Sequence, residues 1–126
     1  MAYRNILLID DDVEDQEIFR EALQVLSDSL ICTAFSNAKE ALNKLTVDAL
    51  NPDVIFLDLN MPIMSGQEFL TYVKKLDTKK DIPVIIFSTS SNPSTIQVTK
   101  DLGAIDFITK PDRFDRLVEI LKPIIN

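Results

Sequence analysis

The chain has 126 residues, 46% of them hydrophobic and 26% charged, which is typical of one globular domain with its own core. Its formal net charge of −7 disfavours a nucleic-acid partner, because proteins bind such partners largely through basic groups that meet phosphates. The absence of histidine and the single cysteine exclude the common zinc sites and an internal disulfide. Any metal chemistry must therefore rely on oxygen ligands and hard cations.

No apolar run approaches the roughly 20 residues that a membrane-spanning helix needs, and the N-terminus lacks the features of a secretory signal. We therefore expect one cytoplasmic domain over residues 1–126, with no membrane insertion. The lysine pairs at 74–75 and 79–80 are interpreted as a solvated helix end.

Short apolar runs of strand length alternate five times with amphipathic segments of helix length. The predicted strands are Asn5–Ile9, Ile31–Phe35, Val54–Leu57, 84–87 and 106–108. Most of these runs are uninterrupted, as in parallel sheets that helices cover on both faces. The pattern predicts an α/β flavodoxin-like (βα)5 sandwich, doubly wound, with a parallel sheet of order 2-1-3-4-5.

The helical segments carry their own start signals. Apolar residues recur at helical spacing over Val13–Leu26, and Asp12 is the expected N-cap of that helix. The next helices are predicted to open at Asn37, Ser65 and Asn92, and the last one near Asp112, with Pro123 loosening its final turn.

Polar residues follow the strands at the edge where doubly wound sheets bind ligands. They are Asp10 and Asp11 after the first strand, Asp58 after the third, Ser88 after the fourth and Lys110 after the fifth. In the order 2-1-3-4-5 the first and third strands are neighbours, so the three acids should share one cleft. Three carboxylates repel each other unless a cation intervenes, and Mg²⁺ suits such a set of oxygen ligands.

Structural explanations compete with this reading at single positions. Helix capping accounts for Asp12 but not for Asp10 and Asp11, which directly abut an apolar strand where uncompensated charge is costly. Asp58 likewise interrupts an apolar run. Lys110 alone would be an ordinary loop lysine, whereas opposite three acids it becomes a counter-ion for phosphate.

Four segments together resemble the receiver domains of two-component response regulators. ILLIDDDVED is similar to the family's acidic first-strand signature, and FLDLNMPIMSG to its phosphoacceptor segment. PVIIFSTSS is similar to its hydroxyl-bearing fourth strand, and GAIDFITKP to its closing lysine-proline motif. The resemblance covers nearly the whole chain and looks most like bacterial single-domain receivers, so we expect a stand-alone receiver.

The resemblance implies a role for each matching residue. Asp58 would be the phosphoacceptor, and Asp10, Asp11, Asp58 and the backbone carbonyl of Asn60 would hold Mg²⁺. Ser88 and Lys110 would complete the site, and Phe107 would occupy an aromatic switch position. A cis peptide bond is implied between Lys110 and Pro111.

The implied function is phosphorelay signalling. A histidine kinase or phosphotransfer protein would donate a phosphoryl group to Asp58, and the resulting aspartyl phosphate would alter a surface that binds a downstream protein. Ser88 would hydrogen-bond a phosphoryl oxygen and draw its loop inward, and Phe107 would fill the vacated space. The domain would not be a turnover enzyme, although phosphotransfer and dephosphorylation would use its own groups.

Three alternatives stay open. Phe107 could be a plain core aromatic, as aromatic residues in strands usually are. A phosphatase of the haloacid dehalogenase type also uses an aspartate after a strand with Mg²⁺, but Asn60 stands where its second acid is expected. Finally, the fold could serve as an interaction module that works without phosphorylation.

Overall fold

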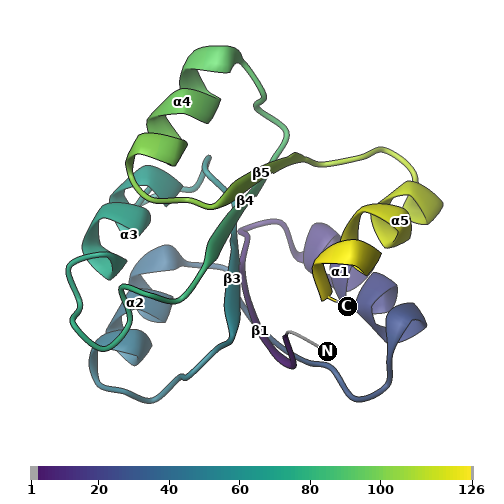
Figure 1. Cartoon of the computed structure of the whole chain (residues 1–126), viewed down its shortest axis with the longest axis horizontal. Helices are drawn as coiled ribbons and strands as arrows, with labels where there is room; N and C mark the ends of the chain where they lie inside the picture. The colour runs from purple at the N-terminus through teal and green to yellow at the C-terminus, as the bar shows by residue number, and fades with distance from the viewer. Residues whose placement is uncertain (1–2, 126) are drawn as a thin grey trace.

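The computed structural model describes residues 3–125, so residues 1, 2 and 126 of the predicted domain lie outside the described part. The strands are β1 (Asn5–Ile9), β2 (Ile31–Phe35), β3 (Val54–Leu57), β4 (Val84–Ser88) and β5 (Asp106–Thr109). They form one parallel sheet of order β2-β1-β3-β4-β5 (Figure 1). The predicted flavodoxin-like order is confirmed, with β4 and β5 one residue longer than expected.

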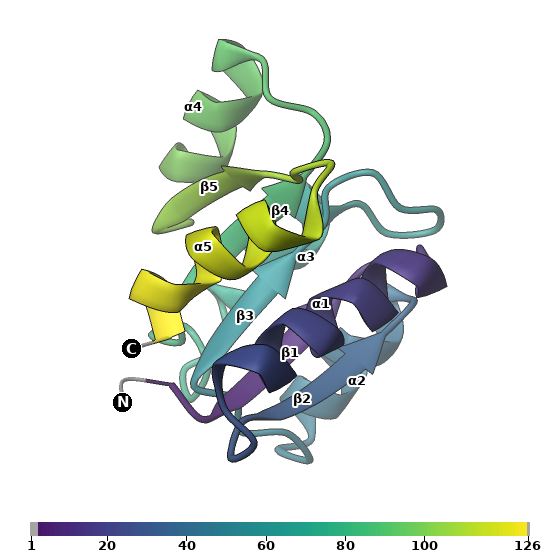
Figure 2. The same ribbon diagram turned by 90° about the vertical axis from the view of Figure 1, so that its right-hand side faces the viewer.

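Five helices cover the sheet in two layers. They are α1 (Val13–Leu26), α2 (Ala38–Thr46), α3 (Gly66–Val73), α4 (Pro93–Asp101) and α5 (Phe114–Ile125). Helices α1 and α5 lie side by side on one face, whereas α2, α3 and α4 lie on the other (Figures 1 and 2). None of the helices within residues 3–125 is long and apolar enough to cross a membrane.

The core has two halves, one on each face of the sheet. Alternate residues of β1 show the division: Ile6 and Leu8 pack with α1 and α5, and Leu7 and Ile9 pack with α2 and α3. Strands β3 and β4 are buried along their whole length, while the edge strands β2 and β5 are partly exposed. This explains why the central strands are continuous apolar runs.

The four predicted helix caps form. Asp12, Asn37, Ser65 and Asn92 each accept a backbone N–H in the first turn of α1, α2, α3 and α4. Helix α5 begins at Phe114, near Asp112 as predicted, and Leu117 N donates to Arg113 O in its first turn. Pro123 lies inside α5, which continues to Ile125.

Lys79 corrects the interpretation of the lysine pairs as a solvated helix end. Its side chain is only 3% exposed, and its Nζ donates to the carboxylate of Asp48 and to Asn51 Oδ1. These residues come from the loops before β3 and β4, which meet at the amino ends of the strands. No local pattern in the sequence predicts that these two loops are joined in this way.

Candidate functional site

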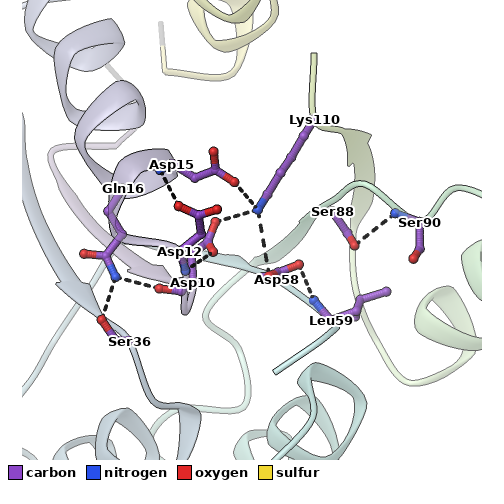
Figure 3. A network of polar contacts seen from close by, with 10 residues as sticks. All are labelled: Asp10, Asp12, Asp15, Gln16, Ser36, Asp58, Leu59, Ser88, Ser90 and Lys110. Atoms are coloured by element: carbon purple, nitrogen blue, oxygen red, sulfur yellow. Dashed lines mark hydrogen bonds and ion pairs between the residues drawn. The ribbon is translucent and has the colours of Figure 1, made fainter. Parts of the chain in front are cut away.

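The residues expected to carry chemistry gather at the carboxyl ends of four strands. Asp10 directly follows β1, Asp58 follows β3, Ser88 ends β4 and Lys110 follows β5. Figure 3 shows their side chains pointing toward one another from these different elements. The parallel sheet of order 2-1-3-4-5 is what brings them together, because it makes β1 and β3 neighbours and aligns all the strand ends.

Three carboxylates form an oxygen cluster. One carboxylate oxygen from each of Asp10, Asp11 and Asp58 lies within 4.8 Å of the other two. Asp10 and Asp58 are buried, with 1% and 7% exposure, whereas Asp11 is exposed. The cluster is therefore walled by protein on one side and reachable from solvent on the other.

The Lys110 side chain, which is only 10% exposed, reaches into this cluster from the loop after β5. Its Nζ donates to Asp10 Oδ2 at 2.7 Å and to Asp15 Oδ2 at 2.9 Å, and it lies 3.8 Å from Asp58 Oδ2. The ammonium also sits 5.6 Å from the centre of the Phe87 ring, which is buried. The contact with the three acids was expected for Lys110, whereas its pairing with Asp15 was not predicted from the sequence.

The loop from β1 to α1 fixes the position of Asp10. Asp12 N donates to Asp10 Oδ1 at 3.0 Å, and the buried Gln16 donates through Nε2 to Asp10 O at 2.6 Å. The same Gln16 amide donates to Ser36 Oγ at 3.0 Å. Sequence reasoning missed Gln16; its place one turn into a helix that starts beside the acids was the available signal.

Asp58 is held by backbone contacts. Its backbone N donates to Ile9 O at 2.9 Å, and its Oδ1 accepts from Leu59 N at 2.8 Å. Gly66, at the start of α3, packs against this backbone, and a Cβ there would lie 2.3 Å from Asp58 O. Only glycine lets α3 approach the segment that carries Asp58 so closely.

Hydroxyl and amide groups line the remaining side. Ser88 is fully buried, its Oγ accepts from Ser90 N at 3.3 Å, and the hydroxyl also lies beside the Asp58 carboxylate. Asn60 Nδ2 donates to Ser90 Oγ at 2.9 Å, which links the loops after β3 and β4. A metal contact through the Asn60 backbone carbonyl stays a prediction.

Burial sets the electrostatics of the site. Desolvation raises the pKa of Asp58 above its ordinary value of 3.8, and Lys110 offsets this only in part. Burial likewise raises the pKa of Asp10, against the opposing effect of its hydrogen bond to Lys110. At Lys110, desolvation acts to lower the pKa, but the carboxylates of Asp10 and Asp15 outweigh it and the net direction is upward.

The donor set fits a hard cation. Lys110 brings one ammonium to three carboxylates, those of Asp10, Asp15 and Asp58, and Asp11 adds a fourth carboxylate to the cluster, so acidic groups outnumber basic ones. Its metal-binding atoms are all oxygens, the ligands that Mg²⁺ prefers, and the exposed side leaves room for the waters that Mg²⁺ usually keeps.

Phe107 lies on β5, is half-buried, and packs against the core half that contains α2 and α3. It lines a cavity of about 320 Å³, together with Ile96, Thr99, Lys100, Ala104, Ile105 and Asp106. The aromatic ring thus has both packing neighbours and adjoining space. Its role as a switch stays a prediction beside the reading as a core aromatic.

The expected cis bond before Pro111 is wrong: no cis peptide bond occurs within residues 3–125. The trans form is the ordinary one, favoured before proline by roughly 0.5–1 kcal/mol. With this trans bond, the Lys110 ammonium already contacts Asp10 and Asp15, so its placement in the site does not require the cis form.

Comparison with known proteins agrees with this architecture. The family model for the response regulator receiver domain matches residues 6–122. A protein-glutamate methylesterase/protein-glutamine glutaminase from Clostridium acetobutylicum is 38% identical over 111 residues, which cover 86% of this chain and 31% of that protein. A second one, from Methanococcoides burtonii, is 34% identical over 94% of this chain and 33% of its own length. The chain thus spans about a third of these relatives.

Solved structures match over almost the full length of the chain. The phosphorylated cyanobacterial phytochrome response regulator RcpA has a TM-score of 0.88 and 34% identity, covering 98% of this chain and 91% of that one. The chemotaxis protein CheY4 of Vibrio cholerae has a TM-score of 0.82 and 28% identity, covering 98% and 99%. Given the matched family model, the sheet order and the acidic cluster, this chain belongs to the response regulator receiver domain family.

Proposed function

We propose that Asp58 accepts a phosphoryl group in a Mg²⁺-dependent reaction and that the domain thereby switches a protein-binding surface in phosphorelay signalling. The observation that carries the proposal is the position of the Asp58 carboxylate, which belongs to the three-acid oxygen cluster and lies 3.8 Å from the Lys110 ammonium. A buried carboxylate in such a place is costly to the fold, which favours a functional role over a structural one.

The donor in this proposal is a phosphohistidine on a histidine kinase or a phosphotransfer protein. An Asp58 carboxylate oxygen attacks phosphorus while the P–N bond breaks, and the electron pair of that bond stays on the imidazole nitrogen. Such a transfer needs positioning and charge neutralisation more than further covalent chemistry. Asp58 meets the first need because backbone bonds to Leu59 and Ile9 hold its position.

Charge neutralisation comes from three groups. Asp10, Asp11 and Asp58, with the backbone carbonyl of Asn60, would hold Mg²⁺, which offsets the charge of the phosphoryl oxygens. Lys110 supplies a fixed positive charge 3.8 Å from Asp58 Oδ2. Ser88 offers its hydroxyl hydrogen to a further oxygen. In dephosphorylation, a water oxygen would attack phosphorus while the bond from phosphorus to the Asp58 oxygen breaks and inorganic phosphate leaves, and the same groups would assist.

The signal would travel from Ser88 to β5. Strands β4 and β5 pair in parallel, with Ser88 opposite Thr109 and Ile86 opposite Phe107. A phosphoryl group that draws Ser88 inward therefore acts on a strand that directly neighbours the Phe107 backbone. The surface formed by α4, β5 and α5 is the proposed contact for a downstream protein.

Intact-mass measurement tests the phosphoacceptor. The protein is incubated with Mg²⁺ and a small acyl phosphate, and we expect a mass gain of one phosphoryl group that chelation of Mg²⁺ prevents. Asp58→Asn should remain unlabelled. Asp77→Asn is the matched control, since Asp77 is exposed in the loop before β4, and it should be labelled like the wild type.

Labelling that persists in Asp58→Asn, or an unlabelled wild type, contradicts the proposal. Phosphotransfer profiling with purified histidine kinases then tests the donor class. Turnover of a generic phosphomonoester would instead favour a phosphatase.

A further inference from the structure

The Lys110 ammonium has more carboxylate partners than the proposed reaction needs. Of its three hydrogens, one is donated to Asp10 at 2.7 Å and another to Asp15 at 2.9 Å. Asp58 Oδ2, at 3.8 Å, lies beyond hydrogen-bond distance. Two of the three hydrogens are thus held by acids other than the phosphoacceptor.

Asp15 differs from the other acids around Lys110. It is absent from the three-carboxylate cluster that could hold a metal ion, and it stands in the first turn of α1. Its side chain is 35% exposed, whereas that of Asp10 is 1% exposed. Water can replace Lys110 at the Asp15 carboxylate, but breaking the Asp10 contact would leave a buried charge without a partner. Asp15 is therefore the exchangeable partner.

We propose that Asp15 is a positioning residue that restrains the phosphorylation of Asp58 by competing for Lys110. This inference rests on the proposed phosphoacceptor function. Asp15 ties up one ammonium hydrogen that a phosphoryl oxygen could accept, and its negative charge repels an incoming phosphodonor. Both effects slow the reaction, so the expected direction is the same whichever dominates.

The buried surroundings of Lys110 make the competition effective. The Phe87 ring lies under the ammonium and itself packs edge-on against Phe19, with centroids 5.5 Å apart. The Phe87 ring limits where the ammonium can move, so the positive charge of Lys110 is shared among Asp10, Asp15 and Asp58. If one acid is removed, the Lys110 ammonium interacts more strongly with the other two acids and with a phosphoryl group on Asp58.

The test compares Asp15→Asn with Glu14→Gln. Both remove one negative charge from the first turn of α1, but Glu14 is exposed and does not pair with Lys110. At saturating Mg²⁺, we expect Asp15→Asn to speed labelling of Asp58 by a small acyl phosphate about fivefold, the rate equivalent of releasing one partly exposed ion pair. Glu14→Gln should change it less than about twofold.

A double-mutant cycle shows whether Asp15 acts through Lys110. In a Lys110→Met background, Asp15→Asn should accelerate labelling clearly less than fivefold, because only its repulsion of the phosphodonor is then relieved; a full fivefold gain there would show that Asp15 does not act through Lys110. Asp15→Glu, which restores the charge, should bring the slow rate back. In protein without Mg²⁺ or donor, the ¹H–¹⁵N resonance of the Lys110 ammonium should shift in Asp15→Asn and stay in place in Glu14→Gln.

The possible failures are separable. If the wild type is not labelled on Asp58, the phosphoacceptor function itself fails. If the wild type is labelled and Asp15→Asn is equally fast or slower, only the competition is wrong, and a slower variant would mean that Asp15 assists Lys110. Unfolding curves of each variant confirm that the compared proteins are folded.

Discussion

A lysine that is mostly shielded from solvent pairs with carboxylates at each end of the sheet, but the two ends differ in their balance of positive and negative charge. At the amino ends, Lys79 meets one carboxylate, Asp48, and the amide oxygen of Asn51, and Asp48 is 71% exposed to solvent. At the carboxyl ends, Lys110 faces Asp10, Asp15 and Asp58, of which two are buried. At the amino ends, the lysine and its partners form a charge-balanced structural contact. At the carboxyl ends, the acids outnumber the lysine.

The pKa directions express the same contrast. The hydrogen bond from Lys79, with the charge of its ammonium, lowers the pKa of Asp48, so the ionised form stabilises the fold. Burial raises the pKa of Asp10 and Asp58, so their ionised forms are a cost to the fold. Excess charge that the fold itself does not neutralise indicates a place for a cation and a reaction.

The two glycines, one at each end, give the largest expected effect. Gly66→Ala should reduce the free energy of unfolding by about 3 kcal/mol, because its Cβ would meet Asp58 backbone at 2.3 Å, and it should also slow labelling of Asp58. Gly103→Ala should lower the free energy of unfolding by roughly 1–2 kcal/mol, because a side chain is strained at the φ of 111° that Gly103 adopts, and labelling should be unchanged. Urea unfolding measures the stability of each variant, and intact mass measures its labelling. Equal loss of labelling in the two variants would contradict the assignment of the reaction to the carboxyl ends alone.

Mg²⁺ should stabilise the protein through the carboxyl end alone. At about 100 times the dissociation constant, binding to the folded state adds about 2.7 kcal/mol to the free energy of unfolding. A raised carboxyl pKa means that the folded state takes up protons more readily than the unfolded chain, so Asp10 and Asp58 oppose folding least at low pH.

The stabilisation by Mg²⁺ should therefore shrink as pH falls from neutral toward the ordinary carboxyl value of 3.8, because protons then displace the cation from these two acids, whose pKa burial has raised. Thermal unfolding with and without Mg²⁺ across this range measures it. Asp11→Asn should reduce the gain at every pH, whereas Asp48→Asn should leave it intact. A gain that does not vary with pH would argue against binding at the buried acids.

Lys79→Met tests whether the amino end is purely structural. Methionine retains most of the buried volume but removes the ammonium bonds to Asp48 and Asn51, so the free energy of unfolding should fall by about 2 kcal/mol. Labelling of Asp58 in the folded variant should match the wild type. Lys80→Met, at the exposed neighbour, is the control and should be close to neutral. Impaired labelling in Lys79→Met would show that the two ends are coupled.

Removing one acid from each end should change stability in opposite directions. Asp58→Asn should raise the free energy of unfolding by about 1 kcal/mol near neutral pH without Mg²⁺, because it removes an ionised carboxyl whose pKa burial has raised. The gain should vanish below the ordinary value of 3.8, where the wild-type carboxyl is protonated in both states. Asp48→Asn should instead destabilise, since it removes a carboxyl whose pKa Lys79 lowers. A change in unfolding free energy of the same sign in both variants would contradict the contrast between the two ends of the sheet.

Local patterns were sufficient for most of the fold. The continuous apolar runs predicted the three strands β1, β2 and β3 with their bounds, and capping residues such as Asp12 and Ser65 predicted helix starts. These features depend on neighbours close in sequence, which is why one sequence can reveal them. The start of α5 at Phe114 likewise lies near Asp112, as predicted.

For the site, the sequence by itself determined which groups are available: the acids after β1 and β3, the hydroxyl that ends β4 and the lysine after β5. Strand order then follows from general rules for parallel sheets. Only the tertiary structure decided how these charges are shared, since Asp15 and Lys110 are 95 residues apart and Lys79 and Asp48 are 31 apart. Partnerships over such distances depend on how loops meet in space, and the local pattern around each residue does not encode them.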